Sequence, residues 1–318
     1  MAVLLADAKK LTQDKLTQDV IDEFRKDALM DALVYDNCVA LNGGSTLAYT
    51  YNRVTTHGTA AFREVNNEYT DQEAKTTQHT TNLKIFGGSF GLDRVIQKNV
   101  KGVTNQLAFQ LQQKIEGARA LFSDTFFNGD NSEDTKVFDG LDVALTGSST
   151  EINAAGNLID LSTASAIDTN YKIFLDAVED LLSELDGTPT FLAMNRKLRS
   201  AFNKVGRRTV AYTETRDEFG RPVQYYDGIQ LITIGDKPNT ANPIIENHST
   251  NGTSLYAVRV GLDGVCAVTP EGDNIIDVYM PDFTTPGAVK RGEVEMVAGL
   301  AVKATKSAGV LRKIKAVA

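Results

Sequence analysis

The clearest pattern of apolar and polar positions in the chain is a helical one at residues 102–127. Apolar residues recur there every three or four positions, and mainly glutamine, lysine and glutamate stand between them. The recurring residues are Val103, Leu107, Leu111, Ile115, Ala118, Phe122 and Phe126. With a rise of about 1.5 Å per residue, the pattern predicts a helix roughly 35–40 Å long that ends at the turn signal Asn128-Gly129-Asp130.

Residues 46–82 show a strand pattern with little apolar content. Ten of these 37 residues are threonine and only 11 are apolar. Residues 47–55 and 76–85 are rich in β-branched and aromatic side chains, so they predict two strands. An isolated pair of strands cannot bury a core of its own. We therefore expect the segment to lie on something else, which would cover its large aromatic residues Tyr49, Tyr51, Phe62 and Tyr69.

The rest of the chain alternates between helix and strand signals. An amphipathic helix is expected at residues 19–33, and another at 171–185 with Asn170 as its N-cap. The dipeptide Asp227-Gly228 predicts the turn of a β-hairpin within residues 221–234. The remaining predicted elements are a strand at 190–194, a helix at 196–205, and strands at 255–260, 275–279, 293–304 and 310–316. This mixture of short elements predicts an α+β fold.

Composition and charge exclude several classes of protein. The 318 residues are 42% hydrophobic and 23% charged, which suits about two globular domains, and no apolar run approaches the ~20 residues of a membrane span. Two cysteines are too few for a disulfide scaffold and favour synthesis in a reducing cytosol. The net charge of −8 and the pI of about 5.1 argue against a sequence-specific nucleic-acid binder.

The charge is unevenly distributed along the chain. Residues 290–318 carry seven basic and two acidic residues. This local excess of positive charge has two interpretations. It is either a solvated end of the chain, which is the simpler interpretation, or a segment that lies against a polyanion or an acidic neighbouring subunit.

The search for catalytic or metal chemistry finds one motif. Residues 87–91, Gly-Gly-Ser-Phe-Gly, fit the G-x-S-x-G pattern of a nucleophile elbow, which needs a strand before the serine, a helix after it and a histidine later in the chain. The only histidine downstream is His248, in a polar loop, so we interpret the motif as a glycine-rich turn. The three histidines and two cysteines lack metal-ligand spacing, and no phosphate-binding glycine motif occurs. We expect no enzyme activity, cofactor or metal ion.

The order of these segments resembles that of the major capsid proteins of tailed bacteriophages, whose Hong Kong 97-type capsid fold is also used by encapsulin shells. Six stretches carry the resemblance, and their order is more specific than any one of them. They are residues 62–69 (FREVNNEY), 83–94 (LKIFGGSFGLDR), 127–130 (FNGD), 138–141 (FDGL), 219–229 (FGRPVQYYDGI) and 299–302 (GLAV). The resemblance implies five parts: an N-terminal arm (1–45), an extended β-hairpin loop (46–84), a peripheral domain (85–139) with a spine helix (102–127), an axial domain (140–270), and a return to the peripheral domain (271–318).

The same resemblance implies a structural function. The subunit would assemble through pentamers and hexamers into an icosahedral shell around the phage double-stranded DNA, without reading the DNA sequence. Portal, scaffolding and cement proteins would be further partners, and assembly in the host bacterial cytoplasm would end in a virion capsid. About 45 residues precede the loop and the first is Met1, so scaffolding is expected to be a separate chain. The expected inter-subunit contacts are Tyr49, Tyr51, Phe62, Arg63, Glu64, Tyr69, Arg207 and Arg208.

Two alternatives stay open, an encapsulin-like compartment around an enzyme cargo and a monomeric serine hydrolase that uses Ser89.

The resemblance also bears on whether the subunits of the shell are joined covalently. Some relatives form an isopeptide bond between a loop lysine and an asparagine late in the peripheral domain. Lys75 and Lys84 could supply the amine, but residues 275–318 contain no asparagine. A disulfide would need Cys38 and Cys266 to meet between chains. We therefore expect a shell that is held together without covalent bonds.

Overall fold

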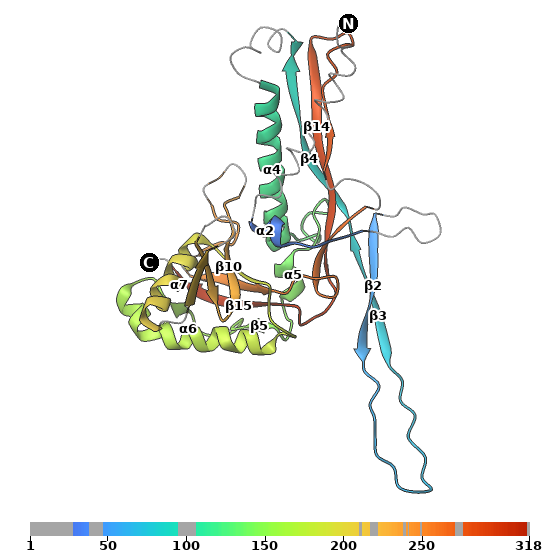
Figure 1. Cartoon of the computed structure of the whole chain (residues 1–318), viewed down its shortest axis with the longest axis vertical. Helices are drawn as coiled ribbons and strands as arrows, with labels where there is room; N and C mark the ends of the chain where they lie inside the picture. The colour runs from blue at the N-terminus through green and yellow to red at the C-terminus, as the bar shows by residue number, and fades with distance from the viewer. Residues whose placement is uncertain are drawn as a thin grey trace.

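The computed structural model describes residues 28–37, 47–94, 106–209, 212–216, 222–237, 240, 242–248, 250–270 and 276–316. Within these ranges the chain forms a tall unit around a long helix, a larger sheet with helices on one face, and a hairpin that projects away from both (Figure 1). Of the expected N-terminal arm and its helix at residues 19–33, only α2 (Ala28–Ala32) and β1 (Tyr35–Asn37) lie inside the described ranges.

The tall unit is a long helix packed on a two-stranded ribbon. The predicted spine helix is confirmed as α4 (Gln106–Asn128). Its periodic apolar positions are buried against the ribbon and the core beneath it, including Leu111, Ile115, Phe122 and Phe126. The sheet runs in the order β1, β12 (Val265–Thr269), β14 (Val289–Val302) and β13 (Asp277–Tyr279), with β4 (Lys84–Asp93) also paired to β14.

The larger sheet carries its helices on one face. In order, its strands are β5 (Glu151–Ile152), β15 (Ala308–Lys315), β11 (Thr253–Val258), β7 (Phe191–Met194), β10 (Ile229–Thr233), β9 (Pro222–Tyr226) and β8 (Tyr212–Arg216), and β6 (Ile159–Asp160) also pairs with β15. The helices are α6 (Ala164–Glu184) and α7 (Arg196–Thr209). Between them and the sheet, Phe174, Phe202 and Tyr226 pack edge to face and anchor an apolar core.

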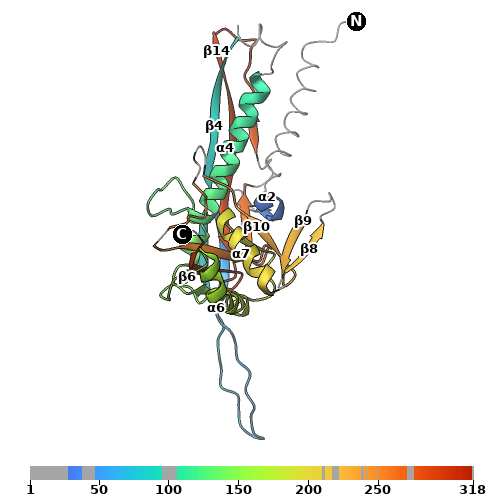
Figure 2. The same cartoon turned by 90° about the vertical axis from the view of Figure 1, so that its left-hand side faces the viewer.

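The predicted threonine-rich excursion is a separate two-stranded sheet. It consists of β2 (Ala48–Thr56) and β3 (Lys75–Asn82), which pair antiparallel, and residues 57–74 connect them. Figures 1 and 2 both show this hairpin extending well beyond the rest of the molecule. A single residue, Leu83, separates β3 from β4, so the hairpin continues directly out of the ribbon of the tall unit.

Two strands lie in a different sheet from the one that the predicted domain boundaries imply. β12 falls inside the range predicted as axial domain, yet it pairs with β1 and β14 in the smaller sheet. β15 falls inside the predicted return to the peripheral domain, yet it pairs with β11 in the larger sheet. The chain therefore crosses between the two units more often than its order of segments suggests.

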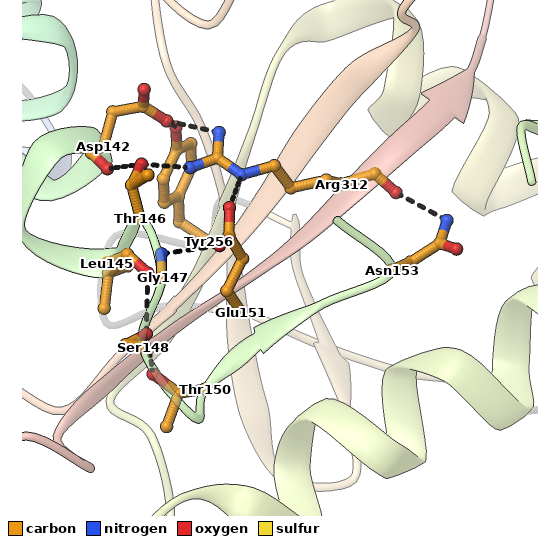
Figure 3. A network of polar contacts seen from close by, with 10 residues as sticks. All are labelled: Asp142, Leu145, Thr146, Gly147, Ser148, Thr150, Glu151, Asn153, Tyr256 and Arg312. Carbon is orange, nitrogen blue, oxygen red and sulfur yellow. Dashed lines mark hydrogen bonds and ion pairs between the residues drawn. The ribbon is translucent and has the colours of Figure 1, made fainter. Parts of the chain in front are cut away.

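A polar network joins β15 to α5 (Leu141–Leu145) at the boundary between the two units (Figure 3). The guanidinium of Arg312 donates to Asp142 and to Glu151, each at 2.5 Å, and to the hydroxyl of Thr146 at 3.1 Å. The buried hydroxyl of Tyr256 donates to the same Asp142 carboxylate at 2.9 Å. Removing one partner would leave a half-buried charge unpaired, so this network fixes how the units meet.

The basic C-terminal segment is largely neutralised within the chain. Four of its seven bases pair with acids of other elements: Lys303 with Asp36, Lys306 with Glu184, Arg312 with Asp142 and Glu151, and Lys315 with Asp160. The interpretation of this segment as a solvated end is therefore wrong for Lys303, Arg312 and Lys315, whose side chains are largely buried, whereas Lys306 stays half exposed. The positive charge of the three buried side chains is directed to the chain's own acidic residues.

Two local predictions also need correction. Residues 87–91 are not a turn, because they lie inside β4 and pair with β14 residue by residue, with exposed Ser89 opposite Glu293. The helix predicted from Asn170 starts earlier, since the hydroxyl of Thr163 caps α6 by accepting from the Ala166 amide. Asn170 instead lies within α6, where its side chain donates to the Asp160 carbonyl at 3.0 Å.

Gly87 of β4 stands where the backbone of β14 approaches most closely. A Cβ built on Gly87 would lie 1.9 Å from the carbonyl oxygen of Val294, so we predict that Gly87→Ala lowers the free energy of unfolding by roughly 2 kcal/mol. Gly58→Ala is the matched control, because a Cβ there meets nothing within 4 Å. Urea unfolding of both variants checks this, and equal stabilities would show that the ribbon tolerates a side chain at Gly87.

Candidate assembly interface

The hairpin is held in register by side chains that pair across its strands. The hydroxyls of Thr50 and Thr80 lie 3.3 Å apart, and those of Thr55 and Thr77 lie 2.7 Å apart. Cross-strand pairs of this kind stabilise an antiparallel pair without apolar burial. The high threonine content therefore suits a ribbon that has water on both sides along most of its length.

The base of the hairpin contacts the body through one face of β2. Alternate residues on a strand point the same way, which places Tyr49, Tyr51 and Arg53 together. The Tyr51 hydroxyl donates to the carbonyl of Val302 at 2.9 Å. The guanidinium of Arg53 donates to the same carbonyl at 2.6 Å and to that of Lys303 at 3.0 Å. These bonds fix the root of the hairpin to the end of β14.

An ion pair stands beside this root. The ammonium of Lys303 donates to Asp36 at 2.8 Å and lies over the ring of Tyr49, whose hydroxyl donates to Asp36 at 2.7 Å. Burial alone would lower the pKa of Lys303, but its hydrogen bonds to Asp36 and Tyr49 raise that pKa well above the ordinary value. Burial raises the pKa of the Tyr49 phenol as well, so both donors keep their protons at neutral pH.

A small apolar cluster lies beneath the same root. Leu83, Cys266, Val268 and Ala301 are buried there, with Tyr49 and Tyr51 packed against them. Burial raises the pKa of the Cys266 thiol to about 11, so little reactive thiolate forms near neutral pH. This cysteine serves packing, and Cys38 lies outside the described residues.

Beyond Arg53 the hairpin leaves the body of its own chain. Every residue from 54 to 78 is exposed. The largest apolar side chains in this stretch, Phe62, Val65 and Tyr69, are 107%, 86% and 61% exposed. The stretch thus presents apolar surface that nothing in the described part of the chain covers, which is typical of a surface that binds another protein.

The tip has local order despite this exposure. The Asn67 amide donates to the Glu64 carbonyl at 3.2 Å, and Asn66 adopts a left-handed conformation with φ 74°. Asparagine tolerates that conformation better than most residues, so it suits a tight turn here. The guanidinium of Arg63 lies 5.4 Å from the ring centroid of Tyr69 and donates to the Asn67 carbonyl. These contacts hold the side chains of the tip in a defined arrangement.

The structure places the expected contact residues in three different regions. Tyr49 and Tyr51 bond to their own chain at the root of the hairpin. Phe62, Arg63, Glu64 and Tyr69 are exposed together around the tip. Arg207 and Arg208 lie at the end of α7 on the larger sheet, where Arg208 pairs with Asp168 of α6. Contact of any of these residues with another subunit stays a prediction.

Sequence reasoning missed three residues that define the hairpin. Arg53 follows Tyr49 and Tyr51 in strand alternation, so it could have been grouped with them from the pattern alone. Val65, between Phe62 and Tyr69, is a further apolar residue of the tip that is almost fully exposed. Lys303 had no local signal, because it is distant in sequence from the residues it contacts.

A groove of about 1020 Å³ lies between the root of the hairpin and the end of α6. Its lining mixes charges, with Arg53 and Lys306 facing Glu184 and Asp263. Across the described ranges, no group of three or more His, Cys, Asp or Glu side chains could hold a metal ion. No helix in the same ranges is long and apolar enough to cross a membrane.

Other solved structures share this architecture. No protein-family model and no curated protein sequence matches the chain. Among solved structures, the holo-SrpI encapsulin complex from Synechococcus elongatus is similar, with a TM-score of 0.64 and 15% identity over 91% of this chain and 87% of that chain. A chain from Mycobacterium phage Bobi has a TM-score of 0.59 and 12% identity over 90% of both chains.

The capsid of a native GTA particle is also similar, with a TM-score of 0.57 and 14% identity over 90% of this chain and 89% of that chain. At these identities the likeness is one of fold. It extends over nearly the whole length of each chain. The chain therefore has the Hong Kong 97-type fold shared by phage capsid and encapsulin shell subunits.

Proposed function

We propose that this chain is the major capsid subunit of a tailed bacteriophage. In this proposal it assembles through pentamers and hexamers into an icosahedral shell that encloses double-stranded DNA. Portal, scaffolding and cement proteins are further partners, and assembly takes place in the host cytoplasm. The subunit itself is structural and catalyses no reaction.

One observation carries the proposal. Residues 54–78 are exposed along their whole length, and their apolar residues gather around the tip. Exposing apolar surface of this kind to water costs free energy, and this free energy is recovered when a partner covers the surface. A neighbouring copy in a shell would supply that cover, and the phage and GTA capsid neighbours support such an assembly.

An encapsulin-like compartment is the second candidate. The SrpI encapsulin, whose TM-score to this chain is 0.64, favours it. The contents of purified particles separate the two functions. Nuclease-protected double-stranded DNA of genome length supports the capsid, whereas a bound enzyme cargo without such DNA supports the compartment.

The tip of the hairpin gives the direct test of assembly. Replacing Phe62, Val65 and Tyr69 together by serine should abolish shells seen by electron microscopy, because the apolar surface that a neighbour would cover is lost. The melting temperature of the subunit should stay unchanged, since these side chains are already exposed. The matched control replaces Ala60, Ala61 and Ala74, which are also exposed, by serine. Normal shells from the first variant would contradict the proposal.

A shell held without covalent bonds is the second expectation. The ammonium of Lys84 donates to the Asn131 side chain at 3.0 Å and to the Thr135 carbonyl at 2.5 Å within its own chain. Lys84 is thus engaged within its own chain, and residues 275–318 hold no asparagine that could react with the exposed Lys75. Particles boiled in detergent with reductant should therefore release single chains of 34.5 kDa on a gel. A ladder of multimers that survives this treatment would reveal a lysine–amide link between subunits.

Substitution of Ser89 tests the expectation that this serine is not a nucleophile. This residue lies in the middle of β4, without the sharp turn into a helix that a nucleophile elbow requires. Ser89→Ala should leave shell formation intact and change the free energy of unfolding by less than about 0.5 kcal/mol. Labelling of Ser89 by a fluorophosphonate probe would show instead that the hydroxyl is activated.

A further inference from the structure

The two helices on the larger sheet carry opposite charge. α7 contains six basic residues and no acidic one, although the chain as a whole has a net charge of −8. α6 contains five acidic residues and a single base, Lys172. Charges of one sign gathered on one helix are unfavourable within the subunit, because like charges repel. Such an arrangement is useful when a partner brings the opposite charge.

The two helices lie side by side on one face of the sheet, where Phe174 of α6 packs against Phe202 of α7. Arg199 of α7 donates to the carbonyl of Leu231 in β10 and to the side chain of Gln224 in β9. Asn170 of α6 donates to the carbonyl of Asp160 in β6, which pairs with β15 at the other end. Figure 2 shows the same arrangement, with α7 toward β8 and β9, and α6 toward β6. The basic side chains of α7 and the acidic side chains of α6 therefore form two separate patches on the same layer of the subunit.

Within one chain these charges are paired only in part. Arg208 of α7 pairs with Asp168 of α6, and Arg196 pairs with Asp236. In the described part of the chain, three other exposed bases of α7 form no ion pair. They are Lys197, Lys204 and Arg207, which stand at i, i+7 and i+10 on one side of the helix and are called the basic face here.

The acidic helix α6 lines a groove. A groove of about 560 Å³ runs between α6 and the segment around β5 and β6. Asp176 and Asp180, one helical turn apart, line it and form no ion pair within the described ranges. Ile173, which is 56% exposed, lines it as well. The groove, called the acidic groove here, offers carboxylates for a cationic head group and an apolar wall for its aliphatic stem.

We propose that the basic face of one copy docks in the acidic groove of the next copy, head to tail. This inference rests on the proposed function and identifies the contact that closes the rings of the shell. A contact between two different patches generates a ring when its rotation closes. Each charge pair is weak alone, but a ring repeats it at every junction. Complementary charge also fixes the head-to-tail orientation of neighbouring subunits.

A second copy fits these charges better than a polyanion does. Nucleic acid would be attracted by the basic face but repelled by the five acids of α6 nearby. A second copy of this chain supplies acidic residues to the basic face and basic residues to the acidic groove. The pair of Arg208 and Asp168 shows that the two helices already match in charge where they meet within one chain.

Charge reversal tests the contact. The double variants Lys204→Glu/Arg207→Glu and Asp176→Lys/Asp180→Lys should each raise the protein concentration at which rings form by about tenfold or more, because attraction becomes repulsion. Sedimentation velocity and native mass spectrometry of the full chain measure this. The fourfold variant restores opposite charges at every junction and should recover rings. An equal mixture of the two double variants must alternate them, so it should recover only rings with an even number of subunits.

A control variant and the wild-type protein distinguish failure of this inference from failure of the proposed function. Lys136→Glu reverses an exposed charge in the segment between α4 and α5, outside both helices, and should leave rings unchanged. Wild-type protein that forms neither rings nor shells would contradict the proposed function. Wild-type rings together with unaltered rings from both double variants would contradict this inference alone. If a double variant loses its fold by circular dichroism, Lys204→Ala/Arg207→Ala replaces it, and rings of wild-type strength from that variant would overturn the proposal.

Discussion

The antiparallel pairing of β4 with β14 is the interaction on which the rest of the structure depends. It joins residues 84–93 to residues 289–298, which lie far apart in the sequence. α4 packs along this ribbon, and β12 and β13 extend the sheet from β14. The hairpin continues from β4 through Leu83 alone, so its direction is set by the same pairing. The hairpin and the spine helix therefore take their positions from a ladder that forms only when distant segments meet.

How much the sequence could predict depends on how local each signal was. α4 was predictable because its apolar period extends over more than six turns. The strand at residues 87–91 was not, because glycine normally signals a turn and its reason here is close approach to Val294. The sheet to which β15 belongs was also hidden, since strand pairing is a long-range property that short apolar segments do not specify.

The hairpin shows the same limit at the candidate site. Its two strands and its lack of a core followed from composition, and the structure confirms both. The sequence could not tell which aromatic residues face their own chain and which face outward. Tyr51 bonds to Val302, 251 residues away, so its partner had no local signature. Phe62 and Tyr69 differ from Tyr51 only in lying beyond the point where the hairpin leaves the body.

The root of the hairpin has a mechanical consequence. Tyr51 and Arg53 attach it to the carbonyls of Val302 and Lys303. Those two residues stand where β14 of the smaller sheet ends, and β15 of the larger sheet begins at Ala308. A load applied at the tip therefore acts through a long lever arm on the short link between the two sheets. A force that another protein exerts on the hairpin would therefore be transmitted first to the segment that links the two sheets.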